Sequence, residues 1–215
     1  MIGVPQSIAR QRAPQRLPVP RKDDRMTSGR SVRPLGVATW DAFDELCANS
    51  DGFPSGCYCI GFHEEGPVPK AAGLNRERKH QRVLDGTTHA ALVFDGELCI
   101  GWCQFGPPTE VVRIKNRREY DKNPQETLPD WRIGCNYVRA GHRRQRVASD
   151  ALAGALEVIA AMGGGRVEGY PEPAGPVPAG FLFHGALSTF DQLGFTRDRM
   201  IGKHRWVVSK VVDPT

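Results

Sequence analysis

The sequence has no long apolar stretch. No apolar run among its 215 residues reaches the roughly 18 residues of a membrane-spanning helix, and no apolar core of a secretory signal peptide is present. We therefore expect no membrane partner and a cytoplasmic protein. The length suits one domain, which would bury roughly 70% of the surface of the unfolded chain and so form a sizeable core.

Beyond its first 30 residues the chain has no excess of charge of either sign. Seven of its 29 Lys and Arg and two of its 24 acidic residues lie within 1–30, so 31–215 carries 22 of each kind. The basic tail 1–30 is rich in Pro, Gln and Arg and has no apolar period, which predicts disorder. We favour a translation start at Met26 over a transit peptide as its origin. The net charge therefore says little about what the domain 31–215 binds.

The chain also lacks the cysteine spacing of a zinc site. Cys57 and Cys59 have one residue between them where such sites have two or more, and no clear second ligand pair follows, although His63 is near. Several of the six cysteines lie inside apolar patterns, as buried free thiols do. We predict no metal site.

Hydrophobic periodicity predicts a chain of alternating strands and helices. Thr39 suits the N-cap of a helix, and the Asp95-Gly96 pair suits a two-residue hairpin turn. No internal repeat is present. The expected elements are a strand at 31–35, helices at 40–48 and 70–84, a hairpin at 89–94 and 97–105, a strand at 131–137, a helix running to 162, a strand at 166–171, a helix at 185–193, and two last strands, the second at 204–212.

Two long loops and one basic helix leave alternatives open. The segment 51–66 carries aromatic and cysteine side chains, and it either walls a substrate site or forms a packed lid. The polar loop 107–130 either covers an acceptor pocket or is a variable insertion. The basic residues of 70–84 are interrupted by Glu77 and lack aromatic neighbours, so a solvated face is favoured over a nucleic-acid site.

The stretch from Val138 to Met162 joins a strand to a long helix through a basic turn. In the helix, Ala148, Ala151, Leu152, Ala155, Leu156 and Ile159 form one apolar stripe, and Gly163-Gly164-Gly165 suits its end. The free N–H groups of such a turn and the positive end of the helix dipole both attract phosphate.

This turn resembles the acetyl-CoA signature of the GNAT acetyltransferases, R/Q-x-x-G-x-G/A. Arg143 fills the first position and Ala148 the last, but Arg146 replaces the middle glycine. An Arg side chain there either crowds the ligand or, if the local φ is negative, points outward. Gly101-Trp102-Cys103-Gln104-Phe105 and Leu193-Gly194-Phe195 extend the resemblance. It implies an α/β fold with a mixed, mostly antiparallel central sheet of six to seven strands flanked by about four helices.

The resemblance also implies residues that bind acetyl-CoA as co-substrate. Backbone N–H groups from Arg143 to Ala148 would hold the pyrophosphate. The strand edge near Val138 would pair with the pantetheine arm, and an N–H there would hold the thioester oxygen. Basic side chains would meet the 3′-phosphate. The full set is Asn136, Tyr137, Val138, Arg139, His142, Arg143, Arg144, Gln145, Arg146, Val147 and Ala148.

For catalysis, Glu168 and Tyr170 share a face of a strand beside the expected cleft. Glu168 is a candidate base, because an amine must lose a proton to attack a thioester; the alternative is a surface carboxylate paired with an arginine. The family often uses a Tyr acid where this chain has Phe190. Another group, such as Tyr170, His184 or water, would then protonate the thiolate, unless the thiolate leaves unassisted or the chain is inactive.

The sequence thus predicts an acetyl-CoA-dependent N-acetyltransferase acting on a small-molecule amine or a protein amine. One rival is a non-catalytic acyl-CoA-binding module, which Arg146 and Phe190 favour. The other is a nucleic-acid partner that uses the basic tail, which we consider the weakest. A homodimer stays open.

Overall fold

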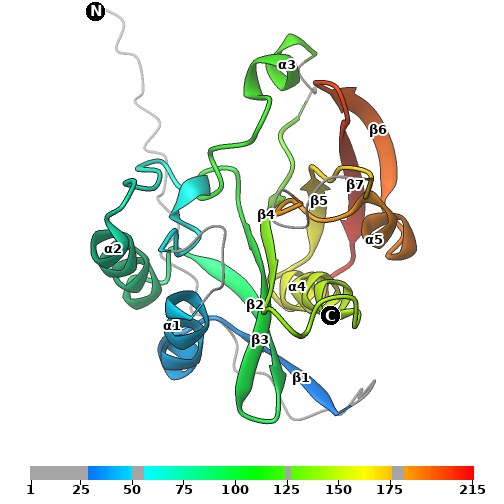
Figure 1. The fold of residues 1–215 in the computed structure, drawn as a ribbon. Coiled ribbons are helices and arrows are strands. Elements are labelled where there is room, and N and C mark those ends of the chain that lie inside the picture. Colours follow the sequence, from blue (N-terminus) through cyan, green and yellow to red (C-terminus); the bar gives the residue numbers. More distant parts are fainter. Residues whose placement is uncertain (1–28, 50–55, 124–126, 176–181) are drawn as a thin grey trace, which may run out of the picture.

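The computed structural model describes residues 29–49, 56–123, 127–175 and 182–215. Its centre is one seven-stranded sheet in the order β1-β2-β3-β4-β5-β7-β6 (Figure 1). Only β4 and β5 are parallel neighbours, which confirms the predicted mixed, mostly antiparallel sheet. The strands are β1 Arg30–Pro34, β2 His89–Asp95, β3 Leu98–Gly106, β4 Trp131–Val138, β5 Gly165–Gly169, β6 Thr196–Ile201 and β7 Arg205–Val212.

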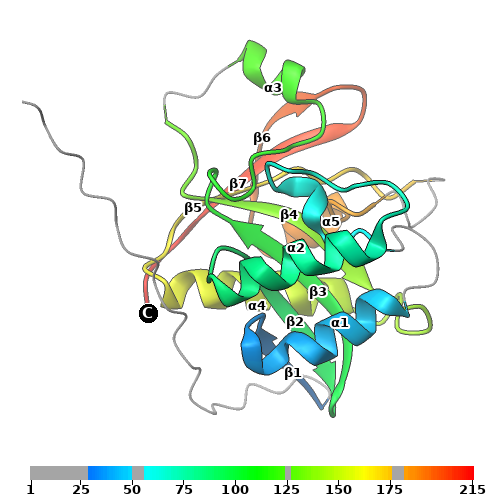
Figure 2. The same cartoon turned by 90° about the vertical axis from the view of Figure 1, so that its left-hand side faces the viewer.

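Five α-helices are found in the described residues, and they cover both faces of the sheet. Helices α1 and α2 lie on one face, and α4 and α5 lie on the other (Figures 1 and 2). None of these helices has the length and apolar character to cross a bilayer. Their bounds are α1 Trp40–Ala48, α2 Ala72–Leu84, α3 Arg117–Lys122, α4 Val147–Ala161 and α5 Leu187–Gln192, with 3-10 turns η1 Val37–Thr39 and η2 Ile60–Phe62.

Each face of the sheet has its own apolar core. Toward α1 and α2, Phe43 and Leu46 pack with Trp102 of β3. Toward α4, the predicted stripe packs against β2, β3 and β5, and Leu152 and Ile159 are fully buried. The amphipathic patterns of α1 and α4 therefore predicted most of the residues that face the sheet, although Ala148 is only half-buried. The basic residues of α2 were expected on a solvated face, and this is wrong for Lys79, which is fully buried.

Two local predictions need correction. The hairpin turn consists of Gly96 and Glu97, one residue later than expected, because Asp95 still pairs with Leu98. Gly96 has φ +58°, which suits a turn with glycine in its first central position.

The expected loop 107–130 contains helix α3, which is too short to show a clear apolar stripe. The predicted tail lies outside the described residues except for Gly29 and Arg30, the latter already in β1.

Strand β4 has two irregularities that shape its outer half. Its pairing with β3 steps two residues from Cys103 to Phe105 but three from Asn136 to Ile133, so β4 carries one extra residue, a β-bulge. Its pairing with β5 is limited to two positions, Trp131 with Val167 and Arg132 with Glu168. Beyond Arg132 the two strands part.

Helix α4 starts close to β3 at a glycine. A Cβ on Gly101 would lie 2.7 Å from the Tyr137 carbonyl oxygen and 2.8 Å from Cγ1 of Val147. We predict that Gly101→Ala lowers the free energy of unfolding by about 1–3 kcal/mol, because backbone or helix must shift. Gly73 in α2 is the control, because a Cβ there meets nothing within 4 Å. Gly73→Ala should raise stability by about 0.5–1 kcal/mol. Equal stability losses in urea denaturation would contradict the close approach.

Candidate functional site

The outer half of β4 presents backbone N–H groups to the gap beside β5. The Arg139 N–H donates to the Ile100 carbonyl of β3 at 2.8 Å. Since hydrogen-bonded residues alternate along an antiparallel pair, the N–H groups of Val138 and Asn136 point away from β3. The Asn136 N–H donates instead to the Phe183 carbonyl at 2.6 Å. Among the described residues, the Val138 N–H meets no comparable acceptor.

The turn between β4 and α4 has the open amides expected of a phosphate-binding turn. Within the described part of the chain, none of the N–H groups from Arg143 to Ala148 forms a backbone hydrogen bond of normal geometry. The Arg146 carbonyl accepts from the N–H groups of Ser149 and Asp150, so the helix is formed from its first turn. Arg30 of β1 fixes the turn by donating to the Gln145 carbonyl at 2.6 Å and to the Asp150 carboxylate at 3.0 Å.

Arg146 has left-handed backbone geometry, with φ +67°. The negative φ that would turn its side chain outward at no cost is therefore not present. Arg144 has the same geometry, with φ +61°. A non-glycine residue in this region costs about 1–2 kcal/mol. The position keeps the backbone shape that a glycine would give, but with a side chain that is exposed to solvent.

The basic side chains around the turn are not equally available to a ligand. Arg139 contacts the Glu45 carboxylate of α1 and donates to the Cys99 carbonyl at 3.3 Å. Arg143 and Arg144 are exposed, and His142 is half-buried. The Tyr137 side chain stacks on Trp102 with ring centroids 4.5 Å apart, so it lies in the core and not at the open edge.

Glu168 and Tyr170 are brought together, as their shared face predicts. The Tyr170 hydroxyl donates to the Glu168 carboxylate at 2.6 Å, and both residues are fully buried. Burial, together with the negative charge of Glu168, holds the pKa of Tyr170 well above its usual value. Arg166 also approaches Glu168 at 3.4 Å, but the carboxylate is not on the surface.

Phe190 is a core residue. It is fully buried in α5, and its ring meets Phe195 edge-on with centroids 4.9 Å apart. Gly169 and Gly185 make room for it, since a Cβ on either would lie within 3 Å of the ring. No side-chain proton is therefore available at this position.

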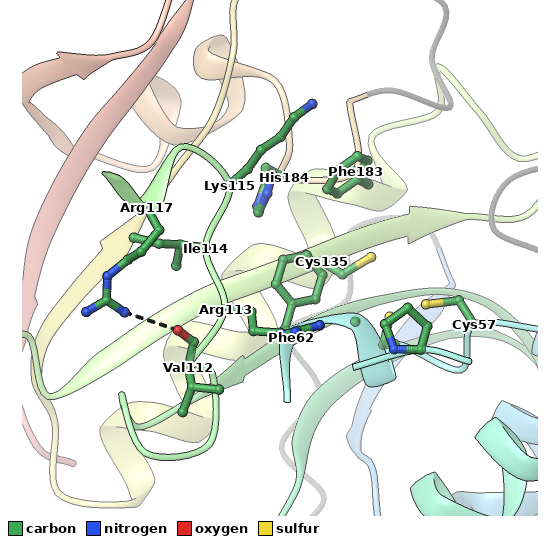
Figure 3. A pocket seen from close by; sticks show the side chains of 13 residues that line it. Cys57, Phe62, Val112, Arg113, Ile114, Lys115, Arg117, Cys135, Phe183 and His184 are labelled. Carbon is green, nitrogen blue, oxygen red and sulfur yellow. Dashed lines mark hydrogen bonds between the residues drawn. The ribbon is translucent and has the colours of Figure 1, made fainter. Parts of the chain in front are cut away.

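A cavity of about 540 Å³ lies beside the bulge of β4. Both loops that were open alternatives contribute to its wall, as Figure 3 shows. The segment 57–67 therefore walls a pocket, and the segment 112–117 covers it. The lining residues are Cys57, Cys59, Gly61, Phe62, Pro67, Val112, Arg113, Ile114, Lys115, Arg117, Cys135, Phe183 and His184.

His184 is the ionisable group buried in the wall of this cavity. Only 2% of its surface is exposed, and neither ring nitrogen forms a hydrogen bond of normal geometry within the described residues, although the Gly134 backbone lies close enough to affect its pKa. Burial and the positive charge of Arg205 lower its pKa well below the usual value, so the imidazole is neutral. The Tyr170 ring meets it edge-on with centroids 6.2 Å apart. Glu168 and Tyr170 thus lie behind His184 and do not themselves line the cavity.

A buried polar cluster supports the cavity wall behind Phe62. The His63 Nε2 atom lies 3.3 Å from the Lys79 ammonium and 3.0 Å from the Gln104 amide nitrogen. Both neighbours are donors, so this nitrogen accepts. Burial and the Lys79 charge lower the pKa of His63 to about 2. Lys79 also donates to the Thr88 hydroxyl at 2.7 Å.

No metal site emerges among the described residues, where no three His, Cys, Asp or Glu side chains converge. Cys59 instead lies 2.9 Å from the indole nitrogen of Trp102, and His63 faces Lys79. Sequence analysis named His184 only as one alternative proton donor, and it did not select Arg113, Lys115 or Cys135. The alternation that includes Cys135 predicts only a strand, and the other residues carry no periodic signal, because their proximity arises from tertiary packing alone.

We predict that Arg146→Gly raises the free energy of unfolding by up to about 1 kcal/mol, since glycine tolerates the positive φ. The same change should tighten acetyl-CoA binding in calorimetry, because the backbone can approach a diphosphate more closely. Arg146→Ala is the control that removes the guanidinium but keeps Cβ, and it should show neither gain. Equal or weaker affinity in the glycine variant would count against this account of the turn.

Acid should destabilise the protein through His63. Its folded pKa is lowered from 6.5, so the unfolded chain binds more protons between about pH 2 and 6.5. The stabilisation by neutral His63 is complete above pH 6.5 and is lost by about 1.4 kcal/mol per pH unit below it. His63→Gln should remove this slope. The variant's stability difference from wild type, followed by denaturation at pH 5–8, should shrink below pH 6.5 and stay constant above it. An unchanged difference across this range would exclude His63 as the cause.

The sequence matches no model of a known protein family and no curated protein. The fold, however, matches solved structures. A GNAT-family protein from Desulfovibrio desulfuricans superposes with TM-score 0.51 at 13% identity, over 85% of this chain and 99% of that one. The GNAT domain of PAT from S. lividans gives 0.50 at 15%, over 84% and 89%. A GNAT-family protein from Bordetella pertussis gives 0.50 at 13%, over 86% and 97%. The predicted resemblance is thus confirmed at the level of structure, and the chain has the fold of the GNAT acetyltransferases.

Proposed function

We propose that this protein is an N-acetyltransferase that moves the acetyl group of acetyl-CoA to a primary amine. The observation that carries the proposal is the set of open amides in the turn 143–148 together with the outward N–H groups of Val138 and Asn136 on β4, of which only that of Asn136 is already bonded, to the Phe183 carbonyl; these donors lead to the cavity beside β4. The diphosphate, the pantetheine arm and the thioester follow one another along acetyl-CoA, and each of them needs hydrogen-bond donors from the protein.

The turn supplies the binding site for the diphosphate. Its open N–H groups and the positive end of the α4 dipole favour two or more negative charges. Arg143, Arg144 and His142 stand around it and can pair with further phosphate. Arg139 forms an ion pair with Glu45, so we propose that its role is primarily structural and only secondarily in phosphate binding.

The β4 edge supplies the site for the thioester. The N–H groups of Asn136 and Val138 face the gap, and either can donate to the thioester oxygen as negative charge develops on it. Oriented donors in a site that excludes water are among the strongest contributions to acyl transfer. The Phe183 carbonyl must release the Asn136 N–H for this to happen.

Acetyl transfer also requires a proton acceptor. The amine nitrogen bonds to the carbonyl carbon, the C–S bond breaks, and the amine loses a proton. His184 is neutral and lines the cavity, and neither of its ring nitrogens forms a hydrogen bond of normal geometry with a described residue, so we propose it as the proton acceptor. We propose that Tyr170, whose hydroxyl is held by Glu168 and whose ring meets His184 edge-on, acts from behind by orienting the imidazole. His184 can then donate this proton to the leaving thiolate. Phe190 cannot do so, because its side chain has no proton to donate.

The second candidate is a non-catalytic module that binds acyl-CoA. Two observations favour it: Arg146 keeps a side chain at the turn where a diphosphate would lie, and Phe183 occupies a donor that catalysis would need. Both candidates require affinity for a CoA thioester. Only the enzyme releases thiol in the presence of an amine.

The test is to measure thiol release from acetyl-CoA with a panel of amines, alongside calorimetry of acetyl-CoA binding. We expect saturable binding and amine-dependent release. His184→Gln should lower kcat by at least about 100-fold, since general bases typically contribute 10²–10⁴. Glu168→Gln, which keeps an acceptor for Tyr170, should lower kcat by less and leave the KM for acetyl-CoA unchanged.

His204→Gln, at an exposed histidine between β6 and β7, serves as the matched control and should retain full activity. Binding without release by any amine would leave the module as the function. Absence of binding to any CoA thioester would remove both candidates.

A further inference from the structure

The cavity beside β4 has an apolar wall that bears three thiols. Its polar lining is confined to a few side chains, and the rest comes from Phe62, Phe183 and aliphatic groups. Burial raises the pKa of Cys57 and of Cys59, so these thiols stay neutral and behave as small apolar groups. A ligand that fills about 540 Å³ of such space needs an apolar skeleton.

The charged groups that line the cavity are all cationic. They come from one segment, 112–117, and no Asp or Glu is among the lining residues that the structure describes. Arg117 is neutralised by Asp121 at 2.7 Å and also donates to the Val112 carbonyl. Arg113 and Lys115 form no ion pair with any described residue. Both are exposed residues, so two cations without a protein ion-pair partner stand at the open side of the cavity, where a ligand can reach them.

The surrounding structure fixes the backbone that carries these two exposed side chains. The Arg113 N–H donates to the Phe62 carbonyl at 3.1 Å, and Ile114 between the two cations is buried. The Lys115 ammonium lies 5.6 Å from the centre of the Phe183 ring. Figure 3 shows Lys115, Phe183 and His184 together on one side of the cavity. An anion partner and a neutral proton acceptor thus occupy the same wall.

We propose that the acceptor is a small apolar amino acid, whose carboxylate binds Lys115 and Arg113 and whose amine faces His184. This inference rests on the acetyltransferase function proposed above. Polyamines, aminoglycosides and lysine-rich peptides are excluded, because each would bring several positive charges to a wall that has no acid to receive them. The product is an N-acetyl amino acid: the new bond joins nitrogen to the acetyl carbon, the amine proton passes to His184, and CoA leaves as the thiol.

The experiment compares amines that differ only in the carboxylate. Thiol release would be measured with phenylalanine against phenethylamine and with leucine against isoamylamine, and with spermidine, kanamycin and a lysine peptide as polycations. We expect kcat/KM to be at least about tenfold higher for each amino acid than for its decarboxylated partner. A hydrogen bond to a charged group typically contributes enough for such a factor.

Single substitutions test whether Lys115 and Arg113 cause this preference for amino acids over their decarboxylated partners. Lys115→Gln and Arg113→Gln should each raise the KM for phenylalanine by about tenfold and leave that for phenethylamine unchanged. Arg118→Gln is the matched control, since Arg118 is an exposed cation of α3 that does not line the cavity.

Each other outcome decides against the proposal. Equal or better use of phenethylamine or spermidine overturns the amino acid as acceptor but keeps the acetyltransferase. Losses that affect both members of a pair equally give Lys115 and Arg113 a structural role only. Thiol release with no amine at all overturns the amino acid and the acetyltransferase together.

Discussion

A backbone N–H group that loses its neighbouring strand needs another acceptor, and in this fold that requirement falls on β4. The strand pairs with β5 at only two positions, and beyond them the Phe183 carbonyl accepts from its Asn136 N–H while the Val138 N–H stays open. Its extra residue at the bulge bends it and redirects its side chains. Helix α4 follows β4 through the turn 143–148, so the open amides of the turn lie next in sequence to the outward Val138 N–H.

The second constraint on the site is the burial of two histidine side chains, His63 and His184, that form no ion pair with any described residue. His63 and His184 are both buried beside positive neighbours, and both are therefore neutral. The two residues differ in their partners. His63 is held among Lys79, Thr88 and Gln104, which makes it a structural acceptor beneath the wall. His184 lacks such partners among the described residues, so its nitrogens remain available to a ligand. The same physical effect thus produces a support in one place and a candidate base in the other.

Sequence patterns predicted the elements well where periodicity was strong. Helix α1 has the predicted bounds because its apolar face is continuous; Thr39 occupies the predicted N-cap position, but its side chain makes no capping hydrogen bond. Strand β4 and helix α4 differ from prediction by a residue or so. The short polar helix α3 was missed because six residues cannot display a stripe. The cavity was beyond sequence analysis, since its wall joins four separate segments. Likewise, the positive φ of Arg146 contradicts the usual preference of the residue type and is set by the turn as a whole.

The hydrogen bond from Asn136 to the Phe183 carbonyl bears on where binding energy would be used. In the free protein this N–H already has a good acceptor, at 2.6 Å. When a thioester oxygen replaces the Phe183 carbonyl, the N–H exchanges one neutral acceptor for another, so the ground-state complex gains little binding free energy. Once the oxygen carries negative charge, the same N–H binds it far more strongly than it bound the amide. Such a pre-occupied donor would favour turnover over tight ground-state binding of the thioester.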